Sequence, residues 1–158
     1  MKIGVISDTH LQDYSSELKH IVDCYFQDMD LILHAGDLVN MRVLDVFLPK
    51  KVEAVSGNMD PQSVRNHFPV KKVIELGAFK IGLIHGWGSP MGLEDRLRNE
   101  FTEIDCLVFG HTHYPVNQVI NGIVFFNPGS ATEKSFTKKN TIGILEIDEK
   151  ITGKIIEL

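Results

Sequence analysis

Two histidines one residue apart, His111 and His113, follow directly after the short apolar run at residues 106–109. An apolar run of this length is typical of a buried strand, and a strand end holds side chains in defined directions. Imidazole nitrogen is a common ligand for transition metals. The pair therefore indicates a metal site, although a lone His-x-His is equally consistent with ordinary polar loop residues.

Polar side chains recur where four other apolar runs end. They are Asp8 and His10 after residues 2–7, Asp37 after 30–35, Asn58 after 51–55, and His85 after 79–84. In open α/β sheets the ligand crevice lies outside the carboxyl ends of the strands, so the spacing predicts that all seven side chains meet there. Singly, Asp8 and Asp37 could be helix caps, Asn58 a turn former and His85 a loop residue. Together, those readings require five coincidences at five strand ends.

The seven side chains offer two carboxylates, one amide oxygen and four imidazoles, and no thiolate. Such mixed oxygen and nitrogen donors suit Mn²⁺, iron or Zn²⁺ better than a structural zinc site. Seven donors are too many for one tetrahedral ion, but they fit two ions about 3.5 to 4 Å apart that share a carboxylate. We therefore expect two divalent metal ions, with manganese as the first choice and nickel, iron, zinc or magnesium as alternatives. The other histidines, His20, His34 and His67, are expected to be ordinary polar residues, with His34 hydrogen-bonded near its strand end.

The elements that must position these side chains alternate between strand and helix in the first half of the chain. Three apolar runs are expected to be strands buried on both faces: residues 2–7, 30–35 and 51–55. Apolar residues three and four apart predict a helix over 18–29, capped by Ser15 or Ser16. A second, short helix is expected from the cap Asn40 through Phe47, ended by Pro49.

From residue 70 the pattern changes to hairpins. The expected strand pairs are 70–76 with 79–84, 116–120 with 123–126, and 141–147 with 151–156. Asn121-Gly122 is the strongest turn signal among them. Before strand 106–109, Ser89-Pro90 is expected to begin a helix whose apolar face runs to Ile104. Alternation followed by hairpins implies an α/β fold of two packed sheets with helices outside.

Composition excludes some classes of protein. A chain of 158 residues is the size of one domain, so we expect a single domain over 1–158. Its net charge of −5 weakens the case for a protein that grips long nucleic acid by its phosphates. Neither Cys24 nor Cys106 has Cys-x-x-Cys spacing, and both are expected to be buried thiols. The chain reaches Asp8 too early for a secretory signal, and no apolar run approaches about 18 residues, so we expect a cytoplasmic protein without a membrane partner.

The ordered series of motifs is Asp8-x-His10, Gly36-Asp37, Gly57-Asn58-x-Asp60, His85-Gly86, Gly110-His111-x-His113 and Asn127-Pro128-Gly129-Ser130. This series resembles the calcineurin-like metallophosphoesterase superfamily, and it covers residues 3 to 130 in the correct order. It is most similar to the small bacterial and archaeal phosphodiesterase branch, which is related in fold to a subunit of the eukaryotic retromer coat.

The resemblance implies an αββα four-layer sandwich, two packed mixed sheets flanked by helices, with a binuclear metal site. One ion would take Asp8, His10, Asp37 and His113; the other would take Asp37, Asn58, His85 and His111, with Asp37 bridging. Asp60 and Asn127 would orient ligands, although a turn explains both residues equally well. The implied reaction is phosphoester hydrolysis by a hydroxide held between the ions, whose pKa falls to about 7 from roughly 16. Asp37, Asn58 and His111 would be the catalytic residues.

Met59 departs from the family pattern, because many members have a histidine between the motif asparagine and its acidic neighbour. A thioether cannot protonate a leaving group, so we expect good activity on activated aryl esters and weaker activity on alkyl esters. The resemblance thus implies a phosphodiesterase for small nucleotide-like or aryl diesters, with no extended nucleic acid as a partner. Homo-oligomerisation through exposed hairpin edges is left open.

Two alternatives remain at this stage. The first is a retromer-like scaffold that keeps the fold and binds metal without turnover, and the second is a nuclease of the same superfamily. Retention of all seven donors favours the enzyme over the scaffold. The short chain, the absence of a capping domain and the negative charge favour a small substrate over a nucleic acid.

Overall fold

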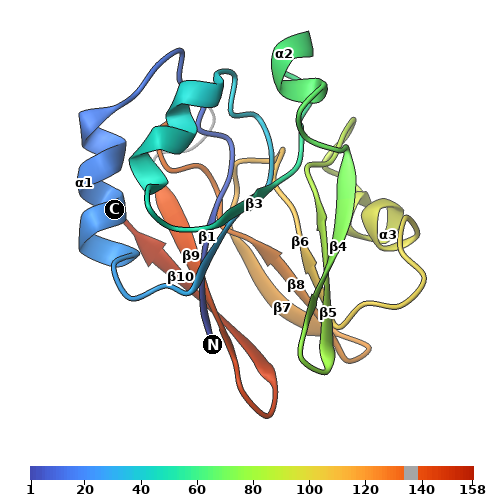
Figure 1. Cartoon of the computed structure of the whole chain (residues 1–158). Helices are drawn as coiled ribbons and strands as arrows, with labels where there is room; N and C mark the ends of the chain where they lie inside the picture. The colour runs from blue at the N-terminus through green and yellow to red at the C-terminus, as the bar shows by residue number, and fades with distance from the viewer. Residues whose placement is uncertain (134–138) are drawn as a thin grey trace.

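The computed structural model of the chain describes residues 1–133 and 139–158. In this part, two five-stranded sheets pack face to face, with helices on both outer faces (Figure 1). The strands are β1 (Lys2–Ile6), β2 (Leu31–His34), β3 (Val52–Ala54), β4 (Lys71–Leu76), β5 (Phe79–Ile84), β6 (Cys106–Val108), β7 (Val116–Ile120), β8 (Ile123–Asn127), β9 (Thr141–Ile147) and β10 (Ile151–Glu157). The helices are α1 (Ser16–Tyr25), α2 (Gln62–Arg65) and α3 (Leu93–Arg98), together with the 3-10 helix η1 (Met41–Phe47).

The first sheet joins the two ends of the chain, with the strand order β10-β9-β1-β2-β3. β1 is parallel to β2 and antiparallel to β9, so Val5 has Leu33 as its partner on one side and Gly143 on the other. β1 is therefore an interior strand. Its nearly continuous apolar sequence is typical of a strand that is covered on both faces.

The second sheet has the order β4-β5-β6-β8-β7, with β5, β6 and β8 parallel to one another. Two antiparallel hairpins, β4–β5 and β7–β8, complete it. Asn121 and Gly122 close the second hairpin with φ values of 50° and 81°, as expected for the two-residue turn that this dipeptide favours. The loops that follow β1, β2, β3, β5 and β6 gather on the side of the molecule from which α2 projects (Figure 1).

Alternate residues of β1 point to opposite faces of the first sheet and so belong to different cores. Ile3 and Val5 lie between the two sheets, in a cluster that includes Leu83 and Val108. Ile6 lies on the outer face with the buried residues of α1 and η1. A third cluster packs α3 against the outer face of the second sheet. The order of layers is therefore helix, sheet, sheet, helix, and the predicted αββα sandwich is confirmed.

Two predicted helices differ in extent from the observed ones. α1 begins after the cap Ser15, whose Oγ accepts a hydrogen bond from Leu18 N, but it ends at Tyr25 and not at 29. The helix expected from Ser89 to Ile104 is only the six-residue α3. Ser89 Oγ accepts a hydrogen bond from Met91 N in a preceding turn, so the turn replaces the first part of the predicted helix.

The prediction that both cysteines are buried is wrong for Cys24, which is exposed, and confirmed for Cys106. The buried residues of α1 are Leu18 and Val22, one helical turn apart, so Cys24 falls on the other side of the helix. Burial, with a contribution from Asp105, raises the pKa of the Cys106 thiol.

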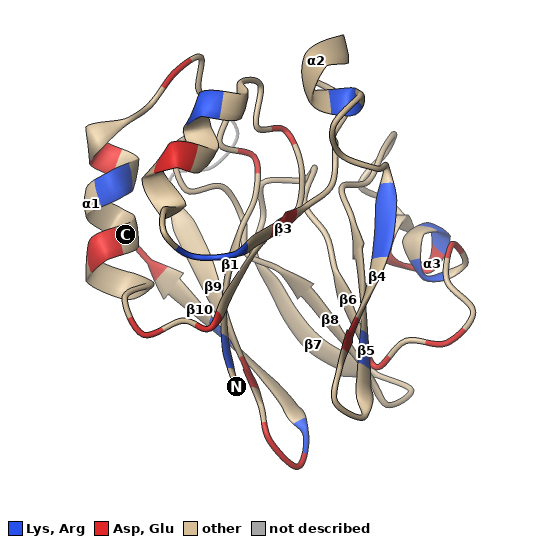
Figure 2. Ribbon diagram, in the orientation of Figure 1, with Lys and Arg blue, Asp and Glu red and all other residues tan. Residues whose placement is uncertain are grey.

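Charged residues of both signs are mixed along α1, η1 and α3 (Figure 2). This distribution is that of an ordinary solvated surface. Among the described residues, no helix has the length and apolar character that a bilayer crossing requires. The cytoplasmic location, the oligomeric state and the single domain over 1–158, which includes residues 134–138 outside the described part, stay predictions.

Candidate metal centre

The structure brings the four candidate imidazoles of His10, His85, His111 and His113 around two carboxylates and one amide. Asp37 Oδ2 lies 3.2 Å from His85 Nε2 and 3.7 Å from His10 Nε2. Asp8 Oδ1 lies 3.2 Å from His113 Nε2. It also lies 3.8 Å from the Nε2 atoms of both His10 and His85. These distances join residues from the ends of β1, β2, β5 and β6.

Asn58 joins the His111 imidazole to this group. Its Oδ1 lies 3.2 Å from His85 Nε2 and 3.1 Å from His111 Nδ1. The other ring nitrogen of His111 lies 2.9 Å from Gly88 O, so both sides of the imidazole are held. All seven side chains predicted from the sequence therefore lie together, and we call them the metal-ligand cluster.

Two triads within the metal-ligand cluster have their donor atoms within 4.8 Å of one another: Asp8 with His10 and His113, and Asp8 with Asp37 and His85. Asp8 belongs to both triads. Asp37 is close to His85 of one triad and to His10 of the other. The resemblance assigned the shared carboxylate to Asp37 alone, whereas the geometry places both carboxylates between the two groups of imidazoles.

The surroundings of Asp8 Oδ1 fit a bound cation. This oxygen is buried and accepts no hydrogen bond from the described residues, even though three imidazole nitrogens lie within 3.8 Å. A buried carboxylate oxygen without a partner is costly, and a metal ion satisfies it directly. The nitrogen and oxygen donors present are those that manganese, iron and zinc accept.

The metal-ligand cluster is built on strained backbone. Five of its residues have φ values between 48° and 70°, in the left-handed region: Asp8, His10, Asp37, His111 and His113. Each non-glycine residue held there costs about 1 to 3 kcal/mol, and such residues concentrate at functional sites. The loops after β1 and β2 brace each other, because Asp8 N donates to Gly36 O and His10 N donates to Asp37 O.

Two glycines leave room for the carboxylates. A Cβ atom at Gly57 would lie 2.1 Å from Asp37 Oδ1. A Cβ atom at Gly110 would lie 2.0 Å from Ser7 Oγ and 2.7 Å from Asp8 Oδ2. The close approach explains why glycine precedes Asn58 and His111 in the motifs.

Asp60 holds the loop that carries Asp37. Its buried carboxylate accepts hydrogen bonds from the backbone N–H groups of Asp37 at 3.1 Å, Val39 at 2.6 Å and Gly57 at 2.7 Å. Val39 has a φ of 71°, a conformation that β-branched residues rarely adopt. The bonds from Asp37 and Val39 fit the orienting role considered for Asp60, and the bond from Gly57, three residues earlier, fits the turn.

Asn127 braces the loop between His111 and His113. Its Nδ2 donates to Gly110 O at 2.9 Å and to Thr112 Oγ1 at 3.2 Å, while its Oδ1 accepts from Gly129 N. These contacts fit the orienting role that the resemblance implied.

Ser7 is a positioning residue that the sequence reasoning missed. Its hydroxyl donates to Asp8 Oδ2 at 2.6 Å and lies 3.2 Å from Ala35 O. His111 N also donates to Asp8 Oδ2, at 3.1 Å. One oxygen of Asp8 is thus fixed by two donors while the other faces the imidazoles. A serine directly before the first motif aspartate is the only signal that the sequence offered.

Charge pairing in the metal-ligand cluster shifts the pKa values of its members. Burial alone would raise the pKa of Asp8, but His113, His85 and the Ser7 hydroxyl outweigh it and hold that pKa below its usual value. The pKa of Asp37 behaves in the same way. Burial alone would raise it, but the hydrogen bond and the charge of His85 outweigh burial and lower it. Burial alone would lower the pKa of His85, but Asp37 and Asp8 raise it to about 9. The cluster therefore keeps both carboxylates ionised and attracts positive charge.

His34 is buried beside the metal-ligand cluster but does not face it. Its Nδ1 accepts a hydrogen bond from Gly36 N, and its Nε2 lies 3.2 Å from Thr9 Oγ1. Burial lowers the pKa of His34 to about 3, so the ring is neutral and donates from Nε2. The prediction that His34 is a hydrogen-bonded histidine near its strand end is confirmed.

Two hollows adjoin the metal-ligand cluster. The larger, of about 510 Å³, is lined by five of the cluster residues together with Met59 and Tyr114. The smaller, of about 300 Å³, is lined by Asn58, His85 and Trp87 among others. Both volumes lie in the range of small-molecule sites.

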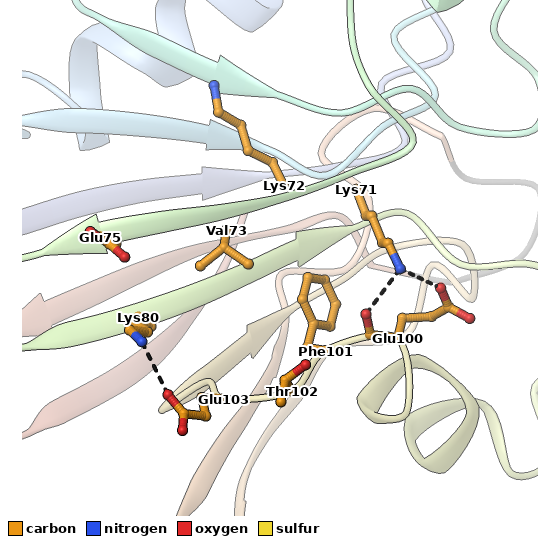
Figure 3. Close-up of a pocket in the computed structure, with 9 residues that line it drawn as sticks. All are labelled: Lys71, Lys72, Val73, Glu75, Lys80, Glu100, Phe101, Thr102 and Glu103. Atoms are coloured by element: carbon orange, nitrogen blue, oxygen red, sulfur yellow. Dashed lines mark hydrogen bonds and ion pairs between the residues drawn. The ribbon is translucent and has the colours of Figure 1, made fainter.

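A third hollow, of about 440 Å³, lies on the β4–β5 hairpin and contains none of the metal-ligand cluster residues (Figure 3). Each lysine that lines it is paired with a glutamate: Lys71 with Glu100, Lys72 with Glu53 and Lys80 with Glu103. Paired surface lysines offer little to an anion. We therefore place the chemistry at the metal-ligand cluster.

Comparison with known proteins gives a match over nearly the whole chain. Residues 1–150 match the profile of the calcineurin-like phosphoesterase superfamily domain. A probable metallophosphoesterase of Methanothermobacter thermautotrophicus is 40% identical over 164 aligned positions, which cover 99% of this chain and 92% of that protein. A phosphodiesterase of Methanocaldococcus jannaschii is 26% identical, and the alignment covers 99% of each chain.

Among solved structures, Vps29 of Entamoeba histolytica in complex with Zn²⁺ is similar, with a TM-score of 0.73 and 26% identity. The alignment covers 99% of each chain. The likeness therefore extends over both sheets and their helices.

Proposed function

The chain belongs to the calcineurin-like phosphoesterase superfamily, and we propose that it is a phosphodiesterase for small aryl or nucleotide-like diesters. Membership makes the protein a metallophosphoesterase, a hydrolase of phosphoester bonds. The observation that carries the proposal is the convergence of seven side chains with oxygen or nitrogen donors. One of these donors, Asp8 Oδ1, is a buried oxygen that accepts no hydrogen bond from the described residues.

We assign one divalent ion to Asp8, His10, Asp37 and His113, and a second to Asp37, Asn58, His85 and His111. Seven donors are too many for one tetrahedral ion, which favours a pair of ions over a single one. Manganese is our first choice, because the donors are carboxylate, amide and imidazole groups without thiolate. When bound, such ions would lower the pKa of a coordinated water to about 7 and would neutralise charge on the phosphoryl oxygens.

The chain's own residues give this centre its shape. Asp37 is fixed by the N–H of Met59, which donates to its Oδ1 at 2.8 Å, while its Oδ2 faces the imidazoles. Asn58 lies between His85 and His111 and keeps both rings turned to the same amide oxygen. We propose Asp37, Asn58 and His111 as the catalytic residues, which touch the reacting phosphoryl group directly or through the ions.

The larger hollow favours a diester over a monoester. In the described part of the chain, neither lysine nor arginine lines this hollow, and Glu133 adds a carboxylate to it. A monoester dianion is commonly held by extra cationic side chains, whereas a diester carries a single negative charge. The similarity to a phosphodiesterase of Methanocaldococcus jannaschii also supports this preference.

A metal-restoration assay tests the proposal. The protein is stripped with a chelator, and Mn²⁺, Ni²⁺, Mg²⁺ or Zn²⁺ is restored singly before nucleotides and aryl mono- and diesters are screened. We expect the diesters to be hydrolysed only after metal is restored, with two ions bound per chain by elemental analysis. Asp37→Asn is the control, since loss of its charge weakens both ion sites; hydrolysis by this variant at the parent rate contradicts the assignment.

The second candidate function is that of a scaffold that binds metal without turnover, to which the similarity to a Vps29 solved with Zn²⁺ gives weak support. In that case the chelated protein would bind metal again, and every ester would stay intact with every metal. Metal binding and turnover measured on one sample therefore separate the two functions.

A further inference from the structure

Two hollows meet at the amide of Asn58. Among the described residues, Asn58 alone lines both of them. Its Oδ1 lies 3.2 Å from His85 Nε2, on the side of the smaller hollow, and 3.1 Å from His111 Nδ1, on the side of the larger hollow. A phosphoryl group held by the metal-ligand cluster would therefore have one hollow on either side.

The smaller hollow is suited to a flat aromatic ring. Trp87 lines it with a side chain that is 43% exposed, and Val70 and the buried Ile84 add apolar surface. Arg65 supplies one cation, whose Nη2 donates to Asn58 O at 2.7 Å and is thereby fixed at the junction with the cluster. An indole and a guanidinium that line one hollow favour aromatic rings through stacking and through cation–π attraction.

The larger hollow contains Met59 and Tyr114, which are each 60% exposed. The N–H of Met59 is bonded to Asp37, so the thioether begins directly beside the metal-ligand cluster. The thioether of Met59 is flexible, so it gives a retained group a less defined surface than the indole of Trp87 does. It suits the substituent that departs.

On the basis of the proposed function, we propose that the smaller hollow binds the retained substituent of a phosphodiester, an aryl or nucleobase ring stacked on Trp87. The leaving group occupies the larger hollow. During hydrolysis the oxygen of water forms the new bond to phosphorus, and the bond from phosphorus to the leaving oxygen breaks with its electron pair. One proton of that water goes to the leaving oxygen, so a phenol or alcohol departs, and the other proton is released. The monoester dianion keeps its ring in the Trp87 hollow.

Trp87 is the single tryptophan of the chain, so its fluorescence reports on this hollow. Diphenyl phosphate and inorganic phosphate are titrated separately into the metal-loaded protein. We expect a saturable change of tryptophan emission with diphenyl phosphate and none with inorganic phosphate. Equal changes of emission with both compounds would overturn the assignment of the hollow. So would unchanged emission with a diphenyl phosphate that still inhibits hydrolysis competitively.

Kinetics on two esters with the same leaving group give the second test. The ratio of kcat/KM for bis(4-nitrophenyl) phosphate to that for 4-nitrophenyl phosphate measures the contribution of the retained ring. We expect Trp87→Ala to lower this ratio about tenfold, which is the worth of one stacked ring, and Trp87→Phe to restore most of it. Tyr114→Ala should lower both rates and leave the ratio within about twofold, because both esters share the leaving group.

Tyr25→Ala is the matched control, since Tyr25 is an exposed aromatic residue on α1 that lines neither hollow. It should leave both rates at the parent value. A ratio that Trp87→Ala does not change, or that Tyr114→Ala lowers instead, overturns the assignment. A parent protein that cleaves neither ester with any metal refutes the proposed function itself. Should Trp87→Ala fail to fold, Trp87→Phe and the fluorescence titration decide.

Discussion

Replacing Gly110 by alanine should damage the metal-ligand cluster without changing any of its ligands. The added Cβ would lie 2.0 Å from Ser7 Oγ and 2.7 Å from Asp8 Oδ2, so the Ser7 hydroxyl must rotate away. Rotation breaks its hydrogen bond to the Asp8 carboxylate, and a hydrogen bond to a charged group is worth about 1.5 to 3 kcal/mol. Overpacking adds about 1 to 3 kcal/mol. Gly110→Ala should therefore lower the free energy of unfolding by about 2.5 to 6 kcal/mol in total. This is a large share of the roughly 5 to 15 kcal/mol that native proteins usually have.

Urea unfolding of the chelated protein measures this loss, and titration with Mn²⁺ measures the accompanying loss of metal affinity. Ser7→Ala provides the matched control, because it removes the nearest of the atoms that the new Cβ would meet. The single variant Ser7→Ala should cost about 1.5 to 3 kcal/mol for the lost hydrogen bond. The double variant should then be less destabilised than the sum of the two single variants by at least about 1 kcal/mol.

Additive free energies, within about 0.5 kcal/mol, would refute the reasoning. They would mean that the cost of Gly110→Ala does not arise at Ser7. Parent-like metal binding in Gly110→Ala would refute the second part, that Asp8 must keep its present position.

Three further predictions concern neighbouring residues. Asp60→Asn, which removes the charge that three backbone N–H groups share, should lower the unfolding free energy of the chelated protein by about 1.5 to 3 kcal/mol in urea. His34 has a folded pKa of about 3, below the unfolded value of 6.5, so the stability it contributes is present above pH 6.5 and lost on acidification. Between pH 7 and 5 this loss is about 2 kcal/mol, and unfolding curves of His34→Asn should lack it; an identical pH dependence in both proteins would contradict the shift. Met59→His should raise turnover of alkyl diesters by up to about 10²-fold relative to aryl diesters in a competition assay, and an unchanged ratio would show that another group already assists the leaving oxygen.

The sequence predicted the strands well because each is a short apolar run that ends in a polar motif. Residues 30–35 and 106–109 are examples, which the structure shows as β2 and β6. Helix ends were less predictable, since α3 owes its short length to Gly92 at a φ of 66° and to a turn around Ser89. The burial pattern of α1 could have placed Cys24 outside, because the apolar stripe through Leu18 and Val22 does not include it.

Strand order could not be predicted from local pattern. The C-terminal hairpin of β9 and β10 follows the second sheet in sequence but pairs with β1 in the first. Pairing across about 140 residues depends on the packing of the whole molecule, which a window of residues does not contain. The layer architecture could be predicted. Strand–helix alternation in the first half of the chain and hairpins in the second leave few ways to bury both faces of each sheet.

The site was predictable as a set of donors but not as a geometry. The positions of Asp8, Asp37 and the histidines at strand ends indicated a common crevice. That Asp8 belongs to both triads follows only from the distances. The contribution of Ser7 and the hollow beside Trp87 depends on side-chain directions, which no motif in the sequence specifies.

The central position of β1 in the first sheet has a consequence for folding during synthesis on the ribosome. The strand that leads to Asp8 precedes one of its two neighbours, β9, by more than a hundred residues in the chain. Until that neighbour arrives, one edge of β1 stays open to solvent and to other nascent chains. The strand that carries Asp8 therefore gains its second neighbour only after β9 has been synthesised.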